Sequence, residues 1–150
     1  MKLACAFLVA LAAHQPGLAR TLPVRSGTQR VESISAKHKA VFRRYVSIWE
    51  SGALNELSSV LAANYVGHAA NGSRGVEGLR DRIIKFHQLY ADVRFAIEDQ
   101  VAEGDRVATR MTATATSSAT GKPTKLIGLN VSRFQDDRIA EEWPVWEVVR

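Results

Sequence analysis

The fold of this chain of 150 residues is decided by residues 92–147, DVRFAIEDQVAEGDRVATRMTATATSSATGKPTKLIGLNVSRFQDDRIAEEWPVWE. Apolar and polar residues alternate in several runs of this stretch, as they do in half-buried strands. Turn residues separate the runs at Gly104-Asp105 and at Gln135-Asp136-Asp137-Arg138. The stretch therefore predicts an antiparallel sheet.

Helical patterns precede these strands. One apolar stripe ends at Ser51-Gly52 and consists of Val41, Tyr45, Ile48 and Trp49. A second, short helix is predicted by Leu54, Leu57 and Leu61, before an extended piece at residues 64–68. A third follows the turn cluster 71–75, with an apolar face at Val76, Leu79, Ile83, Phe86 and Tyr90. Helices followed by antiparallel strands predict an α+β domain with the helices on one face of the sheet.

The N-terminal part is predicted to lie outside this domain. Lys2, the apolar run from Leu3 to Ala13 and the small residues before Arg20 predict a cleaved export signal, Met1–Ala19. A secreted or periplasmic protein is then expected. The alternatives are a buried N-terminal helix or a start codon assigned too far upstream. Residues 20–35 have the composition of a flexible leader, so one domain is expected over residues 36–150.

The amino-acid composition argues against several classes of function. Cys5, the single cysteine, lies in the predicted signal, so the mature chain is expected to have no disulfide, thiolate nucleophile or thiolate metal site. The histidines show no ligand spacing, and no metal is expected. The net charge is +5, but the basic residues are dispersed without interleaved aromatic residues, so no nucleic acid is expected as a partner. No further apolar stretch is long enough to span a membrane.

Several short motifs, in their order along the chain, resemble the SnoaL-like (polyketide cyclase, ester cyclase) branch of the NTF2-like superfamily. They are Tyr65-Val66-Gly67-His68, residues 75–80, Asp92-Val93-Arg94-Phe95, residues 103–107 and Ile139-Ala140-Glu141-Glu142-Trp143. The resemblance implies a cone in which three N-terminal helices pack in a strongly curved antiparallel sheet, with a pocket at its open end. It also implies chemistry without a cofactor. A Trp146 on the outer face would favour a homodimer through the sheet, which is a common arrangement among relatives.

The chain departs from the family pattern at two points that concern chemistry. Family cyclases use an acidic residue of the last strand, usually aspartate, as general base, and the matching position is Glu147. Many members carry Gly-Thr-His after the arginine strand, whereas this chain has Thr114-Ala115-Thr116-Ser117-Ser118. Without that histidine, the cyclase reaction itself is in question.

Strand alternation places Glu141, Trp143 and Glu147 on one side of the final strand. If that side faces the cone, two carboxylates enter an aromatic-lined cavity, and Glu147 is the predicted general base. His68 or Arg110 is predicted to stabilise an oxyanion. The expected pocket lining is Tyr45, Trp49, Asn130, Glu141 and Trp143.

Each of these residues also has a structural interpretation. Glu147 would be solvated at a frayed C-terminus, Arg110 would balance a buried carboxylate, and His68 would be a satisfied structural histidine. Because Trp143 and Trp146 have opposite parity, only one of them is expected in the cavity. His38, at the start of the first helix, is expected to be exposed.

Three functions remain open. The first is a SnoaL-like protein that binds a small, largely apolar carbonyl or polyketide-like molecule and performs cofactor-free cyclisation or isomerisation. The second is a binding module of the same fold without turnover, favoured by the missing histidine and the export signal. The third is an epoxide or ester hydrolase, which would need Glu141, Glu147 and Arg110 to converge on a water molecule.

Overall fold

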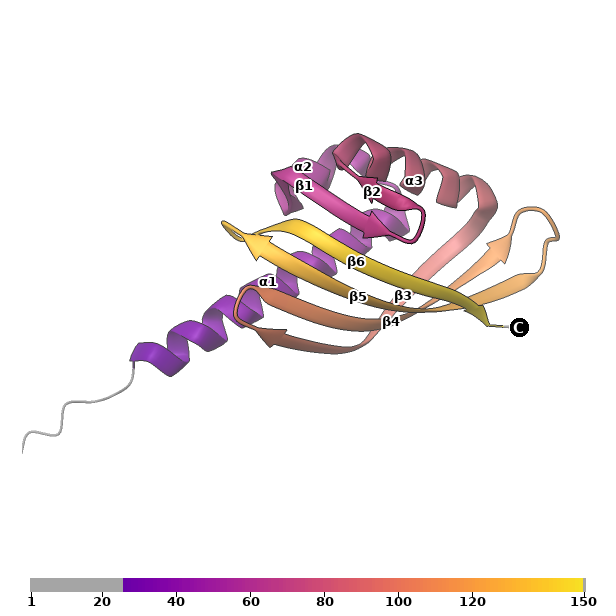
Figure 1. The fold of residues 1–150 in the computed structure, drawn as a ribbon. Coiled ribbons are helices and arrows are strands. Elements are labelled where there is room, and N and C mark those ends of the chain that lie inside the picture. The colour runs from indigo at the N-terminus through magenta and orange to yellow at the C-terminus, as the bar shows by residue number, and fades with distance from the viewer. Residues whose placement is uncertain (1–25, 150) are drawn as a thin grey trace, which may run out of the picture.

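The computed structural model describes residues 26–149, with side chains from residue 34 onward. The predicted export signal, Met1–Ala19, lies outside the described residues. The elements, labelled in Figure 1, are α1 (Ser26–Ser51), the 3-10 turn η1 (Leu54–Glu56), α2 (Leu57–Val60), β1 (Leu61–Ala69), β2 (Gly72–Arg74), α3 (Val76–Leu89), β3 (Tyr90–Glu103), β4 (Arg106–Ser117), β5 (Pro123–Gln135) and β6 (Arg138–Val149).

Helix α1 begins at Ser26 rather than at Ala36. Residues 26–35 are therefore helical, and the expectation of a leader with little fixed structure is wrong over that range. No glycine or proline occurs between Thr28 and Ala40. A helix already nucleated by its packed stripe extends through such residues at little cost, because each added residue gains a backbone hydrogen bond.

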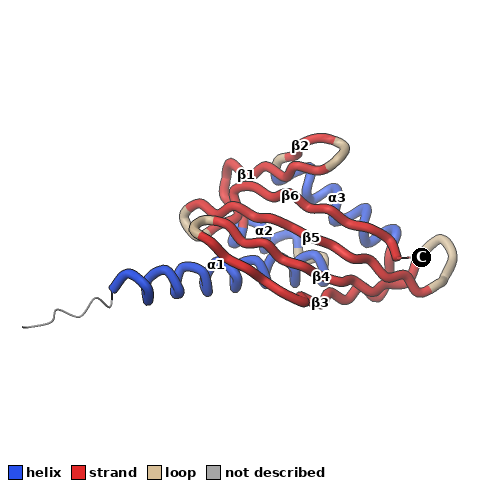
Figure 2. Tube along the Cα trace, turned by 60° about the horizontal axis from the view of Figure 1, so that its bottom comes forward, coloured by secondary structure: helices blue, strands red, loops and turns tan. Residues whose placement is uncertain are grey.

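The strands form one six-stranded sheet in the order β2-β1-β6-β5-β4-β3. All neighbouring pairs are antiparallel except β1 and β6, which run parallel, so the sheet is mixed rather than purely antiparallel. Figure 2 shows the helices on one face of this sheet, and Figure 1 shows the sheet curving beneath them. The predicted α+β class is confirmed.

The core lies between the helices and the concave face of the sheet. The predicted stripe of α1 points into it, because Tyr45 and Ile48 are buried while Val41 and Trp49 pack against the core partly buried. Around them lie Phe42, Leu57, Val60, Leu79, Ile83, Val107, Met111 and Ile139. Each such side chain contributes about 1.5–3 kcal/mol when it is fully buried.

A β-bulge at Ala140 sets the direction of the side chains along β6. Phe134 pairs with Ile139, and the residue before it in β5, Arg133, pairs with Glu141. Ala140 therefore has no partner on β5 and is an extra residue of β6. Beyond the bulge Ser132 faces Glu142. A shift of one residue exchanges the two faces of a strand. Ile139 and Glu142 therefore both point inward, with 0% and 3% of their surfaces exposed.

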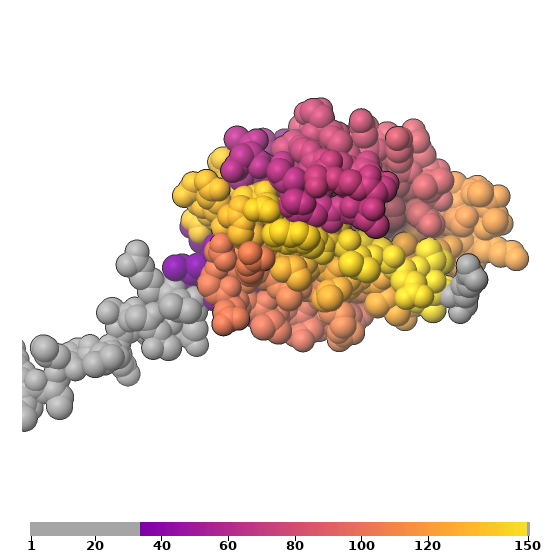
Figure 3. Space-filling model, viewed as in Figure 1, coloured from indigo at the N-terminus to yellow at the C-terminus, as the bar shows by residue number. Residues whose placement is uncertain are grey.

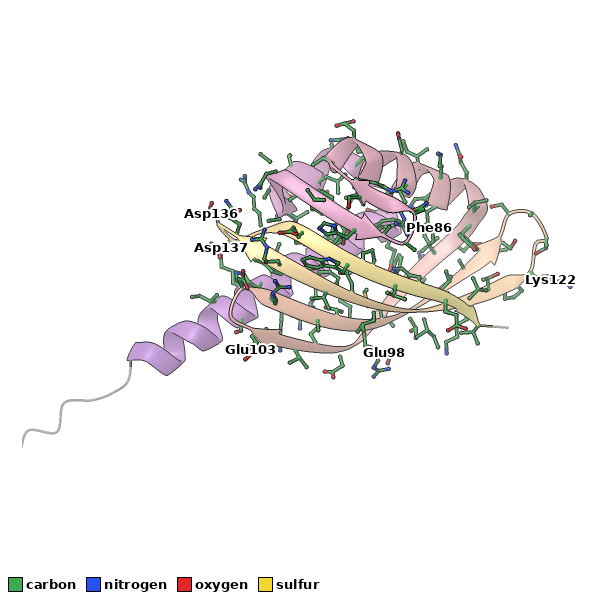
Figure 4. The ribbon with its side chains drawn as sticks, viewed as in Figure 1. Phe86, Glu98, Glu103, Lys122, Asp136 and Asp137 are labelled. Carbon is green, nitrogen blue, oxygen red and sulfur yellow. The ribbon has the colours of Figure 1, made fainter. Side chains whose placement is uncertain are left out.

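The turn between β5 and β6 has the predicted position. Asp136 and Asp137 have φ angles of 49° and 59°, which suit a two-residue hairpin turn and are tolerated by aspartate. Figure 4 labels both residues at this end of the sheet and Lys122 at the opposite end, in the loop between β4 and β5.

Candidate functional site

A cavity of about 260 Å³ lies between α1, α3 and the concave face of the sheet. Most of its wall is apolar or aromatic: Phe42, Val46, Trp49, Phe86, Leu89, Tyr90, Phe95, Met111, Ala113, Leu126, Pro144 and Trp146. Figure 4 labels Phe86, which lies between α3 and the sheet. The volume is slightly below the range of about 300–1,000 Å³ for drug-sized ligands, which favours a small, largely apolar molecule.

One carboxylate, Glu142, contributes to this wall. Its Oε1 accepts hydrogen bonds from the hydroxyls of Tyr45, at 2.9 Å, and Tyr65. Its Oε2 accepts one from Asn130 Nδ2 at 2.9 Å. The partners come from α1, β1 and β5, so the carboxylate is fixed from three directions. Three donors occupy three of its roughly four lone-pair sites, which leaves one for a ligand.

The two tyrosines are permanent donors in this network. Burial raises the pKa of Tyr45 well above its ordinary value, and the nearby charge of Glu142 raises it further. Burial, followed by Glu142, likewise raises the pKa of Tyr65. Both phenols therefore keep their protons at neutral pH and act as hydrogen-bond donors. Tyr45 and Asn130 also line the cavity, whereas Tyr65 supports Glu142 from behind.

Two glycines make room for these side chains. Gly67 pairs with Glu142 across β1 and β6, and a Cβ atom there would lie 2.6 Å from the Tyr65 hydroxyl oxygen. Gly128 pairs with Trp146, and a Cβ atom there would lie 2.5 Å from Cδ2 of the indole. The tyrosine thus crosses the backbone of Gly67 to reach the carboxylate, and the tryptophan lies flat on Gly128 as part of the cavity wall.

A second polar cluster occupies the outer face of the sheet. His68 Nε2 lies 3.0 Å from Glu141 Oε2, and Ser73 Oγ lies 3.1 Å from His68 Nδ1. Arg133 Nε donates to Glu141 Oε1 at 2.8 Å. Hydrogen bonds from Arg133 and then from His68 lower the pKa of the Glu141 carboxyl. The cluster joins β2, β1, β6 and β5.

Trp143 completes the outer cluster. The His68 ring stacks on it with 5.0 Å between centroids and an interplanar angle of 11°. The Arg106 guanidinium lies 5.4 Å from the centroid of the indole. Trp143 is therefore held outside the cavity between a histidine and an arginine.

The structure brings only part of the predicted site together. Tyr45, Trp49 and Asn130 line the cavity. The prediction that one face of β6 carries Glu141, Trp143 and Glu147 into the cone is wrong, because the bulge at Ala140 turns that face outward. The expectation that only one of Trp143 and Trp146 enters is confirmed, and the one inside is Trp146.

The predicted catalytic trio does not assemble. Glu147 is exposed and lies with Ile127 and Val149 near the end of the sheet. Arg110 is also exposed, because its neighbour Thr109 pairs with Asn130 and takes the inward position. His68 belongs to the outer cluster.

Glu142 and Tyr65 were missed as site residues. The sequence Glu141-Glu142 indicates that a carboxylate lies at this point of the strand, but only the bulge decides which of the two faces the cavity. The usable signal for Tyr65 is its spacing from Gly67, since residues two apart share a strand face and a glycine leaves room above the backbone.

His38 is buried rather than exposed, with 6% of its surface accessible. Its ring stacks on Phe134 with 4.3 Å between centroids. Burial lowers the pKa of His38. The negative charge of Asp137, whose Oδ1 lies 3.7 Å from His38 Nε2, acts in the opposite direction and raises this pKa.

Within residues 26–149, no group of three or more metal-ligating side chains is placed to hold an ion. Among the helices of the same residues, none has the length and apolar character needed to cross a membrane.

Comparison with known proteins identifies the family. The profile of the SnoaL-like polyketide cyclases matches residues 39–150. No curated protein matches the sequence. Among solved structures, IdmH of Streptomyces antibioticus, a candidate polyketide cyclase, is 28% identical with a TM-score of 0.68, and the match covers 73% of this chain and 91% of IdmH.

Two further structures share the fold. A candidate polyketide cyclase from Acidithiobacillus ferrooxidans is 25% identical with a TM-score of 0.67, over 76% of this chain and 90% of its own. A protein from Catenulispora acidiphila with a ketosteroid isomerase-like fold is 16% identical with a TM-score of 0.63, over 70% and 83%. The chain therefore belongs to the SnoaL-like polyketide cyclase family and has its NTF2-like α+β fold.

Proposed function

We propose that this protein is a cofactor-independent acid–base enzyme that acts on a small, largely apolar carbonyl compound, with Glu142 as the proton acceptor. The observation that carries the proposal is a buried carboxylate in the wall of an apolar cavity, held by three donors and with a lone pair left for a substrate. The resemblance to candidate polyketide cyclases supports the same reaction class.

The reaction would begin at a carbon next to a carbonyl group. Glu142 takes a proton from this carbon, and the electrons of the C–H bond form an enolate. In a cyclisation, the enolate carbon attacks a second carbonyl of the same molecule, whose oxygen then receives the proton from Glu142. In an isomerisation, the proton returns to a different carbon. Tyr45, Tyr65 and Asn130 keep the carboxylate aimed, and the aromatic walls exclude water.

The test follows proton abstraction directly. The wild type is mixed with 2-acetylnaphthalene in D₂O, and loss of the methyl signal is followed by NMR. We expect Glu142→Gln to slow the enzyme-dependent exchange by about 100-fold or more, as for loss of a general base. Glu141→Gln is the matched control, because its side chain lies on the outer face, and it should exchange at the wild-type rate. Equal rates in the wild type and Glu142→Gln would refute the role of Glu142.

The binding module without turnover remains the second candidate. The specific observation in its favour is that three donors already occupy the Glu142 carboxylate, so most of its acceptor sites are taken by the protein itself. The same experiment separates the two. A wild type that binds 2-acetylnaphthalene, detected by fluorescence of Trp49 and Trp146, but does not exchange its protons is a binder.

The hydrolase alternative has no assembled site. It required Glu141, Glu147 and Arg110 to converge, but Glu141 is bound to His68 and Arg133 while Glu147 and Arg110 are exposed. None of the three lines the cavity.

We also propose a homodimer through the outer face of the sheet. Ile127, Leu129 and Val145 point outward from the adjacent strands β5 and β6 and are 46%, 50% and 69% exposed. In Figure 3 the atoms of β6, in yellow, form part of the open face beside β1, in magenta. We expect the wild type to sediment as a dimer and Val145→Asp as a monomer, while Val101→Asp, on the edge strand β3, stays dimeric. A monomeric wild type would contradict this assembly.

Export is a further proposal, supported by the apolar run Leu3–Ala13 and the small residues before Arg20. If the full-length chain is expressed in a bacterial host, mass spectrometry of the periplasmic fraction should show a chain that begins at Arg20. A full-length chain found only in the cytoplasm would contradict export.

A further inference from the structure

The side of α3 that faces the cavity carries two cations. Arg82, Lys85, Phe86 and Leu89 all line the cavity. Their spacing of three, four and seven residues from Arg82 places them on one helix face. The buried residues of the same helix, Leu79 and Ile83, belong to a different face that packs in the core. Positive charge is thus placed beside a wall that is mostly apolar and aromatic.

Arg82 has no partner within the described part of the chain. It is half-buried, yet no ion pair or side-chain hydrogen bond joins it to residues 34–149. Among residues 34–149, the cation–π contact is made by Arg106 with Trp143, and not by Arg82. By contrast, Arg80, two residues earlier, lies 3.5 Å from Glu77. A partly desolvated charge without a partner is unfavourable, so the Arg82 guanidinium is suited to an anion supplied by a ligand.

The cavity lining also carries charges of both signs. The Glu142 carboxylate and the Arg82 and Lys85 cations all contribute to its lining, so an anionic group is repelled near Glu142 and attracted near α3. A guanidinium pairs with a carboxylate through two parallel hydrogen bonds, which fixes direction as well as position. A molecule with one acidic end would therefore enter in one orientation.

We propose that the ligand of this cavity is an apolar molecule that carries a carboxylate, which pairs with Arg82, with Lys85 nearer the solvent. Resting on the proposed function, this inference makes the substrate an apolar keto acid whose carbonyl part faces Glu142. Arg82 is then the residue that determines specificity and orientation. It touches the substrate but accepts no proton from it.

The test compares three probes of one shape: 2-naphthoate, its methyl ester and 2-naphthamide. Quenching of Trp49 and Trp146 reports their binding to the wild type, Arg82→Gln, Lys85→Gln and the matched control Arg80→Gln. The wild type should bind 2-naphthoate about tenfold or more tightly than either neutral probe, as expected for a hydrogen-bonded charge pair.

Arg82→Gln should weaken 2-naphthoate binding by about tenfold or more and leave the neutral probes within about twofold. Arg82→Lys should recover part of the loss, because it restores the charge without the paired donors. Lys85→Gln, at an exposed position, should weaken 2-naphthoate binding by about twofold to threefold, and Arg80→Gln should leave this binding unchanged. Circular dichroism and the melting temperature check that each variant is folded. If Arg82→Gln does not fold, the comparison of Arg82→Lys with the wild type carries the test.

Two results would overturn the inference: neutral probes that bind as tightly as 2-naphthoate, or an Arg82 variant that binds 2-naphthoate like the wild type. These outcomes are separate from the fate of the proposed function. Glu142→Gln should keep the preference for 2-naphthoate, and bind it somewhat more tightly because a like charge is removed, while it loses proton exchange. Unchanged exchange in Glu142→Gln would refute the enzyme and leave the Arg82 result standing.

Discussion

Replacing Gly67 by alanine tests the support of Glu142 from behind. The added Cβ atom would lie 2.6 Å from the Tyr65 hydroxyl oxygen, 3.3 Å from Tyr65 Cζ and 3.4 Å from Glu142 Oε1. The first distance is far below van der Waals contact. The hydroxyl must therefore swing away from the carboxylate or stay in place under strain.

Both routes have a similar free-energy cost. Loss of a hydrogen bond to a charged group costs about 1.5–3 kcal/mol. Overpacking of a buried site costs about 1–3 kcal/mol. Alanine in place of glycine stabilises by about 0.4–1 kcal/mol through the unfolded chain. We expect Gly67→Ala to lower the free energy of unfolding by about 1–2 kcal/mol, measured by urea denaturation at pH 7 with an unchanged m-value.

A double-mutant cycle with Tyr65→Phe makes this prediction specific. Phenylalanine has no hydroxyl, so the closest remaining contact of the new Cβ atom is Cζ at 3.3 Å, which a small shift relieves. Gly67→Ala should then cost about 0 kcal/mol in the Tyr65→Phe background, which corresponds to a coupling free energy of about 1–2 kcal/mol. If Gly67→Ala costs the same in both backgrounds, the hydroxyl does not occupy the space above Gly67 and the reasoning fails.

Two further predictions concern other parts of the structure. Gly128→Ala should push the Trp146 ring into the cavity, because the new Cβ atom would lie 2.5 Å from Cδ2 of the indole. We expect the free energy of unfolding to fall by about 1–3 kcal/mol and 2-naphthoate binding to weaken. Binding and stability equal to those of the wild type would contradict the flat packing of the indole. Burial lowers the pKa of His38 below its ordinary value of 6.5, so the unfolded chain takes up this proton first. The contribution of neutral His38 to stability is therefore complete above pH 6.5 and is lost as pH falls through the folded-state pKa. The free energy of unfolding measured at pH 7.5 and pH 5.5 should fall less in His38→Gln than in the wild type, and an equal fall would show that His38 is not the titrating group.

The sequence located most elements because their signals are local. Tyr45 and Ile48 recur at helical spacing, so the buried face of α1 could be predicted without knowledge of its partner. Asp136 and Asp137 adopt positive φ angles that aspartate tolerates, and the turn between β5 and β6 lies where the residues indicate. Such features depend on side chains only a few positions apart.

The face of β6 could not be predicted in the same way. An uninterrupted register from the turn would pair Asn130 with Trp143, whereas the bulge pairs Asn130 with Pro144. No glycine marks the bulge. Ala140 is fully buried, and its place depends on packing that holds both Ile139 and Glu142 inward. That packing involves distant elements, so the sequence could not show that Glu142, rather than Glu141 or Glu147, lines the cavity, although Asn130 and Tyr45 line it as predicted.

The bulge also leaves Ala140 without a partner of its own on β5, so the last strand can lose one residue at that position. A genetic lesion that removes the single codon for Ala140 would leave Ile139 opposite Phe134 and Glu141 opposite Arg133, and every later pair would keep its register. Glu142 and Trp146 would then stay inside, because Ile139 and Glu141 would alternate as in an ordinary strand. A deletion well after the bulge, at Val145 for example, would instead reverse the face of the residues between it and Ala140 or of those beyond it.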